Sequence, residues 1–97
     1  MSADDQGGLS VQHDGSGHNF FTVVDGHRAV LEYELDNGTM VITHTGVPEA
    51  IGGRGIAAAL TRSALDHARS VGWKVVPACT YAASYIQRHG EYTDLLG

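Results

Sequence analysis

The sequence has little cysteine and few basic residues, and each shortage excludes a class of protein. Its one cysteine, Cys79, excludes an internal disulfide and a zinc site built from several cysteines. Only 6 Lys and Arg stand against 11 Asp and Glu, which gives a net charge of −5 with histidine neutral. Duplex nucleic acids and anionic membranes favour densely cationic surfaces, so we expect neither as the main partner.

Long apolar stretches are missing as well. No run approaches the roughly 18 apolar residues of a membrane-spanning helix, and no basic start followed by an apolar segment marks a signal peptide. We therefore expect a cytoplasmic protein. With 97 residues, of which 42% are hydrophobic and 18% charged, the chain should form one small folded domain.

The N-terminal segment differs in composition from the rest. Residues 1–17 are polar and Gly-rich, with almost no apolar side chains, and they end in Asp14-Gly15-Ser16-Gly17. Such a segment buries too little apolar surface to offset the entropy of ordering it. We predict a flexible leader over 1–17 and a single domain over 18–97.

Three strands are predicted in the first half of this domain, at 19–24, 28–36 and 39–47. One face of the second strand collects Ala29, Leu31, Tyr33 and Leu35. The same alternation in the third strand places Met40, Ile42 and His44 on one face. Turn signals at Asp25-Gly26 and Asn37-Gly38 join the strands into two hairpins, the second suited to a tight type I′ turn.

The second half changes to helical spacing. Apolar residues recur at helical intervals from about Arg54 to Val71, and Gly72 suits the position beyond a helix end. A short strand at 73–77 follows, and then a second helix at about 81–89. The order is βββ-α-β-α, which predicts an α/β (α+β-like) domain with a mostly antiparallel four-stranded sheet and one parallel pair.

The segment Gly52-Gly53-Arg54-Gly55-Ile56-Ala57 joins a predicted strand to a predicted helix. The first amides of a helix lack internal partners, and glycines let that backbone approach a phosphate closely. Arg54 adds a cation that can hold an anion. Two interpretations stay open, an anion site or a tight turn. The segment matches neither a P-loop nor a dinucleotide fingerprint.

The stretch from Val47 to Ala57 resembles the acyl-coenzyme A signature of the GNAT acetyltransferase superfamily. That signature runs Arg/Gln-x-x-Gly-x-Gly/Ala; here Gly55 and Ala57 match, and Gly52 stands where Arg or Gln is usual. Further segments are similar to the short single-domain GNAT-like acetyltransferases: His44-Thr45, Pro77-x-Cys79-x-Tyr81 and Arg88-His89-x-Glu91-Tyr92-x-Asp94. The resemblance covers residues 18–96.

This resemblance implies a GNAT-like acyl-CoA acyltransferase fold and an N-acetyltransferase that takes acetyl-coenzyme A as substrate. The acceptor would be an amine, on a protein lysine or a small molecule. In the superfamily the sheet splays between two parallel strands, here 39–47 and 73–77, and the pantetheine arm enters the gap, so Thr45 and Val47 would flank it. The phosphates would meet the amides of Gly53, Arg54, Gly55, Ile56 and Ala57.

Three residues are candidates for the chemistry. Cys79 follows the last strand near the expected thioester, where it would act as nucleophile or as acid to the departing thiolate; otherwise it is a small buried residue. Larger relatives place a tyrosine seven residues after this position, but here Ile86 stands there and cannot supply a proton. His44 is either the general base or a hydrogen-bonded core histidine. Glu49 is the alternative base.

Other expectations concern the end of the second helix and the partners. Arg88 and His89 would contact the cofactor's 3′-phosphate or ribose, or serve as cations at a helix C-terminus. The other histidines lack ligand spacing on a shared element, so no metal is predicted: His13, His18, His27 and His67. The missing tyrosine keeps a second function open, a non-catalytic acyl-CoA-binding or CoA-binding regulatory module. We expect a monomer or a weak dimer.

Overall fold

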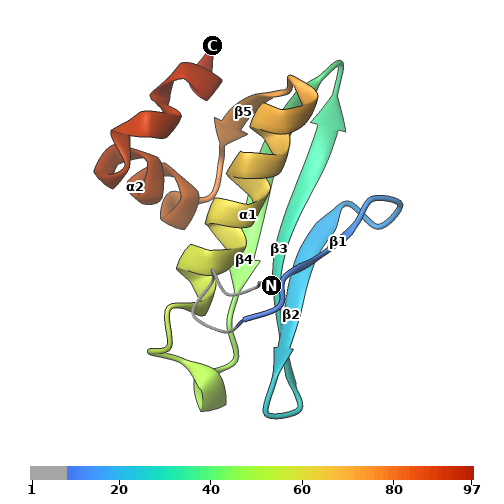
Figure 1. The fold of residues 1–97 in the computed structure, drawn as a ribbon, viewed down its shortest axis with the longest axis vertical. Helices are drawn as coiled ribbons and strands as arrows, with labels where there is room; N and C mark the ends of the chain where they lie inside the picture. The colour runs from blue at the N-terminus through green and yellow to red at the C-terminus, as the bar shows by residue number, and fades with distance from the viewer. Residues whose placement is uncertain (1–8) are drawn as a thin grey trace.

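A five-stranded sheet forms the centre of the fold in the computed structural model, which describes residues 9–97 (Figure 1). Its strands are β1 (Gln12–Asp14), β2 (Asn19–Val24), β3 (His27–Asp36), β4 (Thr39–Gly46) and β5 (Lys74–Pro77). They lie side by side in chain order, and every neighbouring pair is antiparallel except the parallel pair β4–β5. The predicted fold class is confirmed, with one strand more than expected.

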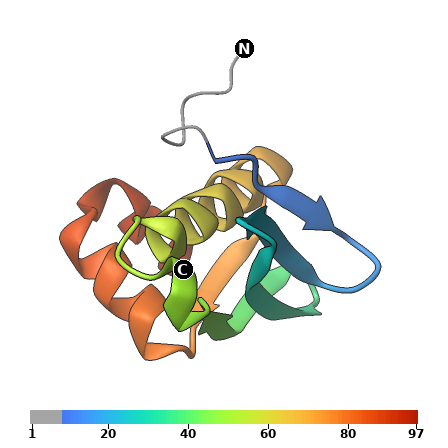
Figure 2. The ribbon, with the colours of Figure 1, turned by 90° about the horizontal axis from the view of Figure 1, so that it is seen from below.

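Helices cover one face of the sheet. The long helix α1 (Ile56–Val71) crosses this face, and α2 (Thr80–Arg88) lies on the β5 side with the 3₁₀ helix η3 (Gly90–Leu96) (Figure 2). A short 3₁₀ helix, η2 (Glu49–Ile51), precedes α1. The opposite face of the sheet carries no helix within residues 9–97. It remains open to solvent over much of β3, where Glu32 and Glu34 are exposed.

The apolar stripe of α1 accounts for its packing on the sheet. Its buried positions include Ile56, Leu60, Ala64 and Ala68, three or four residues apart. The helix ends at Gly72, whose φ of 79° is the left-handed conformation that favours glycine and whose amide donates to carbonyls of the last turn. Facing this stripe are the buried apolar residues of the central strands, Ala29, Leu31, Tyr33, Met40, Ile42 and Val75.

Strand β1 lies inside the segment that we predicted to be a flexible leader. That prediction is wrong for Gln12–Asp14, which pair with the edge of β2. Residues 1–8 lie outside the described part of the chain. An edge strand presents unpaired backbone groups that favour another strand, and the His13 ring adds a stacked contact on Phe20, with centroids 4.1 Å apart. Strand pairing and ring stacking together hold a segment whose composition is polar.

A β-bulge interrupts the pairing of β3 with β4. Tyr33 pairs with Ile42, but the next residue back along β3, Glu32, pairs with His44. Thr43 is therefore the extra residue, and its hydroxyl donates to the Glu32 carbonyl at 3.3 Å. An extra residue in one strand reverses the faces that later side chains occupy.

The bulge decides where His44 points. Regular alternation predicts His44 beside Met40 and Ile42 on the core face, and this prediction is wrong: His44 is exposed, whereas Met40 and Ile42 are buried. The interpretation of His44 as a core histidine fails with it. Thr45 turns to the helix side instead, since it pairs with buried Leu31.

Histidines and aromatic rings gather where β1 meets the core. The Tyr33 hydroxyl and His13 Nε2 share a hydrogen bond of 2.6 Å, and the rings of His13 and His67 lie 4.4 Å apart, edge to face. His67 also packs edge-on against Trp73, and His18 stacks on Tyr33. We call His13, His18 and His67 the β1 histidine cluster. It joins the edge of the sheet to α1.

We expect acid to weaken the docking of β1. Burial and then the His67 ring lower the pKa of His13 below its usual 6.5, although Asp14 partly opposes this. Below the usual pKa of 6.5, the folded chain then binds fewer protons at His13 than the unfolded chain. The stability that neutral His13 contributes is therefore complete above pH 6.5 and declines as the pH falls below it. When the pH falls from about 7.5 to about 5.5, the free energy of unfolding should decrease more in the unmodified chain than in His13→Gln. Unfolding by denaturant at the two pH values measures this difference.

The matched control is His27→Gln, because His27 is an exposed β3 histidine that makes no ring contact with the described residues. This variant should lose as much stability over the interval as the unmodified chain. An equally large loss in His13→Gln would show that His13 does not carry the acid sensitivity.

Candidate active site

The loop between β4 and α1 presents backbone amides toward solvent. Gly53 and Gly55 have φ values of 77° and 74°, a conformation that glycine adopts without the usual side-chain penalty. The first amides of a helix have no carbonyl one turn before them, and the Ala59 amide is the first to bond, to the Gly55 carbonyl at 3.0 Å. Amides 56–58 are thus left for another acceptor at the positive end of the helix dipole.

A buried side chain and two backbone hydrogen bonds hold the start of the loop. Ile51 is fully buried under it, and the Ile51 amide donates to the Pro48 carbonyl at 3.0 Å. The Gly52 amide donates to the Glu49 carbonyl at 3.1 Å in the same short turn. The free amides therefore follow a firmly held turn, which is how an anion site is preorganised.

Strands β4 and β5 part beside this loop. Their pairing runs from Thr39 with Lys74 to Ile42 with Pro77, and one further bond joins the Cys79 amide to the Ile42 carbonyl at 2.9 Å. Beyond that point β5 has ended while β4 continues to Gly46. No strand pairs with this part of β4 on the β5 side within residues 9–97. Its backbone is left for the hydrogen bonds of a bound chain-like ligand.

Cys79 lies at this parting, at the N-cap of α2. Its Sγ lies 3.6 Å from the Thr45 hydroxyl oxygen. Burial raises the pKa of the Cys79 thiol, but the amides of Ala82, Tyr81 and Thr45 and the Thr45 hydroxyl favour the thiolate more strongly. The pKa of Cys79 is therefore lower than usual, as expected for a cysteine at a helix N-terminus.

His44 lies at the same level of β4 on the opposite face of the sheet. It is exposed, and a Cβ added at Gly46 would lie 2.9 Å from its Nε2, so the ring covers a residue that has no side chain. The bulge thus separates two of the predicted catalytic residues, with Cys79 on the helix side of the gap and His44 on the open side. Glu49, the alternative base, is exposed in η2.

The remaining predicted cofactor-binding residues lie at two separate places in the structure. Thr45 and Val47 are half-buried and adjoin the gap, and their place beside a pantetheine arm stays a prediction. Arg88 and His89 lie at the far end of α2 from Cys79, where the His89 ring stacks on Tyr85 with centroids 4.1 Å apart. No contact joins them to residues 53–57 within the described chain, and their role as cofactor ligands stays a prediction.

Sequence reasoning missed the partner of Arg54. The Arg54 Nη1 lies 2.8 Å from Asp25 Oδ2, in the turn between β2 and β3. Asp25 reads in the sequence only as half of a turn signal, and nothing in its spacing connects it to a loop 29 residues later. Ile86 behaves as its type predicts, because it is buried in the core and offers no proton.

Comparisons with known proteins bear on this arrangement. Residues 19–95 match the sequence profile of the GCN5-related N-acetyl-transferase family. The chain belongs to this family. Among curated proteins it is similar to Protein NATD1 of Mus musculus, with 38% identity over 92 residues that cover 91% of this chain and 84% of that protein. Protein NATD1 of Xenopus tropicalis is 34% identical over 91 residues, with the same coverage.

The fold agrees with family membership. An NMR solution structure of a GCN5-like protein from Staphylococcus aureus superposes with a TM-score of 0.70 and 26% sequence identity, and the match covers 90% of this chain and 86% of that one. Membership in the GCN5-related N-acetyltransferase family supports a general acetyltransferase function. Within the described residues, no helix is long and apolar enough to span a membrane, and no group of three or more His, Cys, Asp or Glu is arranged to hold a metal ion.

The contact between Thr45 and Cys79 predicts the reactivity of the thiol. Thr45→Val removes the hydroxyl and keeps the shape of the side chain. We expect the pKa of Cys79 to rise and its alkylation by iodoacetamide at about pH 7 to slow by about two- to fivefold, because the thiolate is the reacting form. The alkylation rate as a function of pH measures this change.

Thr39→Val is the control, because Thr39 starts the same strand and is paired with Lys74, away from Cys79. Its alkylation rate should equal that of the unmodified chain. If Thr45→Val also reacts at the unmodified rate, the hydroxyl does not act on the sulfur.

Proposed function

We propose that this GCN5-related protein transfers the acetyl group of acetyl-coenzyme A to a primary amine. The observation that carries the proposal is the parting of β4 from β5, with Cys79 at the gap and the free amides of α1 beside it. A ligand that carries phosphates at one end and an activated acyl group at the other needs an anion site beside a gap that admits the acyl group. The free amides and the parting of the strands are these two features. Family membership supports the same reaction class.

In this proposal the phosphates of coenzyme A bind the loop before α1. The amides of Gly53, Arg54, Gly55, Ile56 and Ala57 are the donors, and the Arg54 side chain adds a positive charge. The donor set fits an anion, because α1 has 16 residues and no acidic side chain in its first turn to compete with a phosphate. Thr45 and Val47 then flank the pantetheine arm along the unpaired part of β4.

Acetyl-coenzyme A supplies an activated thioester at the gap. His44, on the open face of β4, takes the proton from the acceptor's ammonium group, and Glu49 is the alternative base. The freed amine nitrogen bonds to the acetyl carbonyl carbon as the carbon–sulfur bond breaks. Cys79, on the other face, gives its proton to the departing sulfur, and its lowered pKa makes the thiol a better acid. The nitrogen releases its second proton to water as the amide forms, and the Cys79 thiolate takes a proton back from water. The amine and the thiol thus reach the acetyl group from opposite sides.

A second function follows from one observation. Ile86 is buried where larger relatives have a proton-donating tyrosine, so a chain that binds coenzyme A without turnover is the alternative. This alternative requires the same binding site and no reaction with an amine. Binding and turnover must therefore be measured separately.

Binding is tested with Ala57→Glu. Ala57 is half-buried in the first turn of α1, where a glutamate suits the helix dipole, so the fold should persist while the added carboxylate repels the phosphates. We expect the unmodified chain to bind coenzyme A and acetyl-coenzyme A with one-to-one stoichiometry. Ala57→Glu should raise the dissociation constant at least about tenfold in calorimetric titration.

Ser70→Glu is the control, because it adds the same charge at an exposed position near the other end of α1. Its dissociation constant should stay within about twofold of the unmodified value. An unmodified chain that binds neither ligand up to about millimolar concentration would overturn the proposal and the alternative together.

Turnover is tested with acetyl-coenzyme A and two acceptors in separate assays, spermidine and a lysine-containing peptide. Release of free coenzyme A thiol should depend on the acceptor and should fall by about a hundredfold in His44→Gln and in Cys79→Ala. Full activity in both variants would refute the assigned roles. Binding without acceptor-dependent release would favour the regulatory module.

A further inference from the structure

We propose that Asp25 lowers and tunes the affinity for coenzyme A by holding Arg54 in an ion pair that the phosphates must break. This inference rests on the proposed function. It assigns a role to a residue in the turn between β2 and β3, outside the β4–α1 loop and outside the catalytic candidates. The role is electrostatic competition at the phosphate site.

The geometry brings two distant segments together. Arg54 Nη1 lies 2.8 Å from Asp25 Oδ2, although the residues are 29 positions apart in the chain. The turn between β2 and β3 and the loop before α1 lie at the same end of the molecule (Figure 1). Arg54 is the only Lys or Arg between residues 29 and 61, so the pair engages the one full cation that the loop itself carries.

The turn itself does not require a carboxylate at this position. Asp25-Gly26 has φ values of 52° and 77°, and the next turn, Asn37-Gly38, has 51° and 80°. Both turns therefore use the same backbone conformation, which asparagine adopts at least as readily as aspartate. Asparagine serves at one turn and aspartate at the other. What distinguishes Asp25 is its charge, and that charge meets Arg54.

The strength of the pair suits a contact that a ligand can replace. The side chains of Arg54 and Asp25 are 48% and 66% exposed, and ion pairs so open to water are weak. A pyrophosphate carries more negative charge than one carboxylate, and its oxygens also accept hydrogen bonds from the loop amides. It therefore displaces Asp25 from the guanidinium. Separating Arg54 from Asp25 costs free energy, and this cost reduces the affinity.

The ion pair should also discriminate between ligands. A ligand without phosphates gains nothing from Arg54 and cannot separate it from Asp25. A phosphate-bearing ligand releases the pair and frees the turn between β2 and β3 from the loop. Asp25 thus lowers the affinity of phosphate-bearing ligands, whatever acyl group they carry, and leaves the affinity of ligands without phosphates unchanged.

The experiment measures the dissociation constant of coenzyme A by calorimetric titration at about 50 mM salt, where screening is weak. Asp25→Asn keeps the turn conformation and removes the charge, and we expect about three- to fivefold tighter binding. Arg54→Gln should weaken binding. In the Arg54→Gln background, Asp25→Asn should change the constant by no more than about twofold, since the guanidinium that Asp25 occupies is absent.

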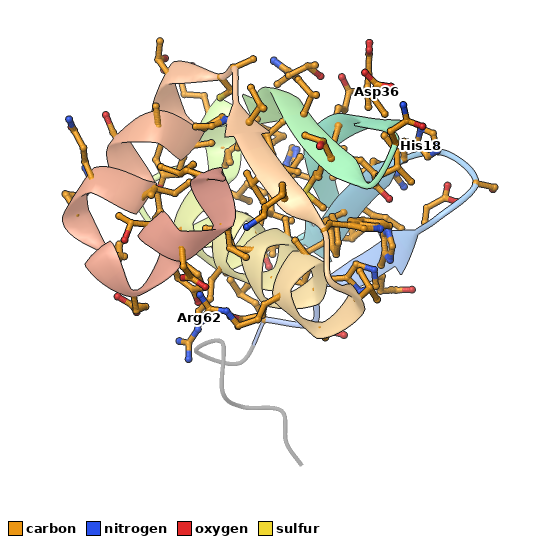
Figure 3. All side chains as sticks on the ribbon, turned by 90° about the horizontal axis from the view of Figure 1, so that it is seen from above. His18, Asp36 and Arg62 are labelled. Atoms are coloured by element: carbon orange, nitrogen blue, oxygen red, sulfur yellow. The ribbon has the colours of Figure 1, made fainter. Side chains whose placement is uncertain are left out.

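Asp36→Asn is the matched control. It removes the same charge from the last residue of β3, where Asp36 is exposed next to the turn that contains Asn37 (Figure 3). Its dissociation constant should stay within about twofold of the unmodified value, which separates a local effect from a change in net charge. Circular dichroism of each variant checks that the fold is kept.

The outcomes separate this inference from the proposed function. If the unmodified chain binds no coenzyme A, the proposed function fails and this inference fails with it. If it binds but Asp25→Asn matches Asp36→Asn, or binds more weakly, the site stands and the role of Asp25 is refuted. Equal tightening with and without Arg54 would also refute the role, because the effect would then be general repulsion.

Discussion

The parting of β4 from β5 is the constraint on which the rest of the candidate site depends. Parallel pairing ends at Ile42 and Pro77, and the Cys79 amide closes the junction by donating to Ile42. One residue later β4 bulges, so the chain leaves the regular ladder where its neighbour strand has ended. A gap with unpaired backbone on one side results. The thiol lies at this gap, the exposed histidine lies on its open face, and the loop before α1 lies beside it.

Helix α1 links the candidate site to the stability of the sheet edge. Its N-terminal end presents free amides to the loop, and near its other end His67 packs against His13 of β1. The stripe between them is buried against the central strands. A 16-residue helix so firmly packed holds its first turn in place without depending on a ligand. The cation of the loop, Arg54, forms an exposed ion pair with Asp25.

Much of the fold could be predicted from local patterns. Alternation in 28–36, the turn at Asn37-Gly38 and the stripe of α1 each depend on neighbours in sequence, and the structure confirms them. The site was predicted less completely. Its loop was predicted because glycines before a helix carry a local signature, whereas the orientation of His44 was predicted wrongly. A bulge is set by the partner strand, and the period of two in the β4 sequence contains no sign of it.

The sequence by itself determined the fold class, the order of the elements from residue 19 onward and the family, because periodicity, turn residues and short motifs are local properties of the chain. Only the tertiary structure decided which face His44 occupies, that Thr45 meets Cys79, and that polar residues 12–14 pair as a strand. It alone brought Asp25 to Arg54. Each of these depends on segments far apart in the chain meeting in space, and a cross-strand register or an ion pair between two loops leaves no periodic mark in either segment.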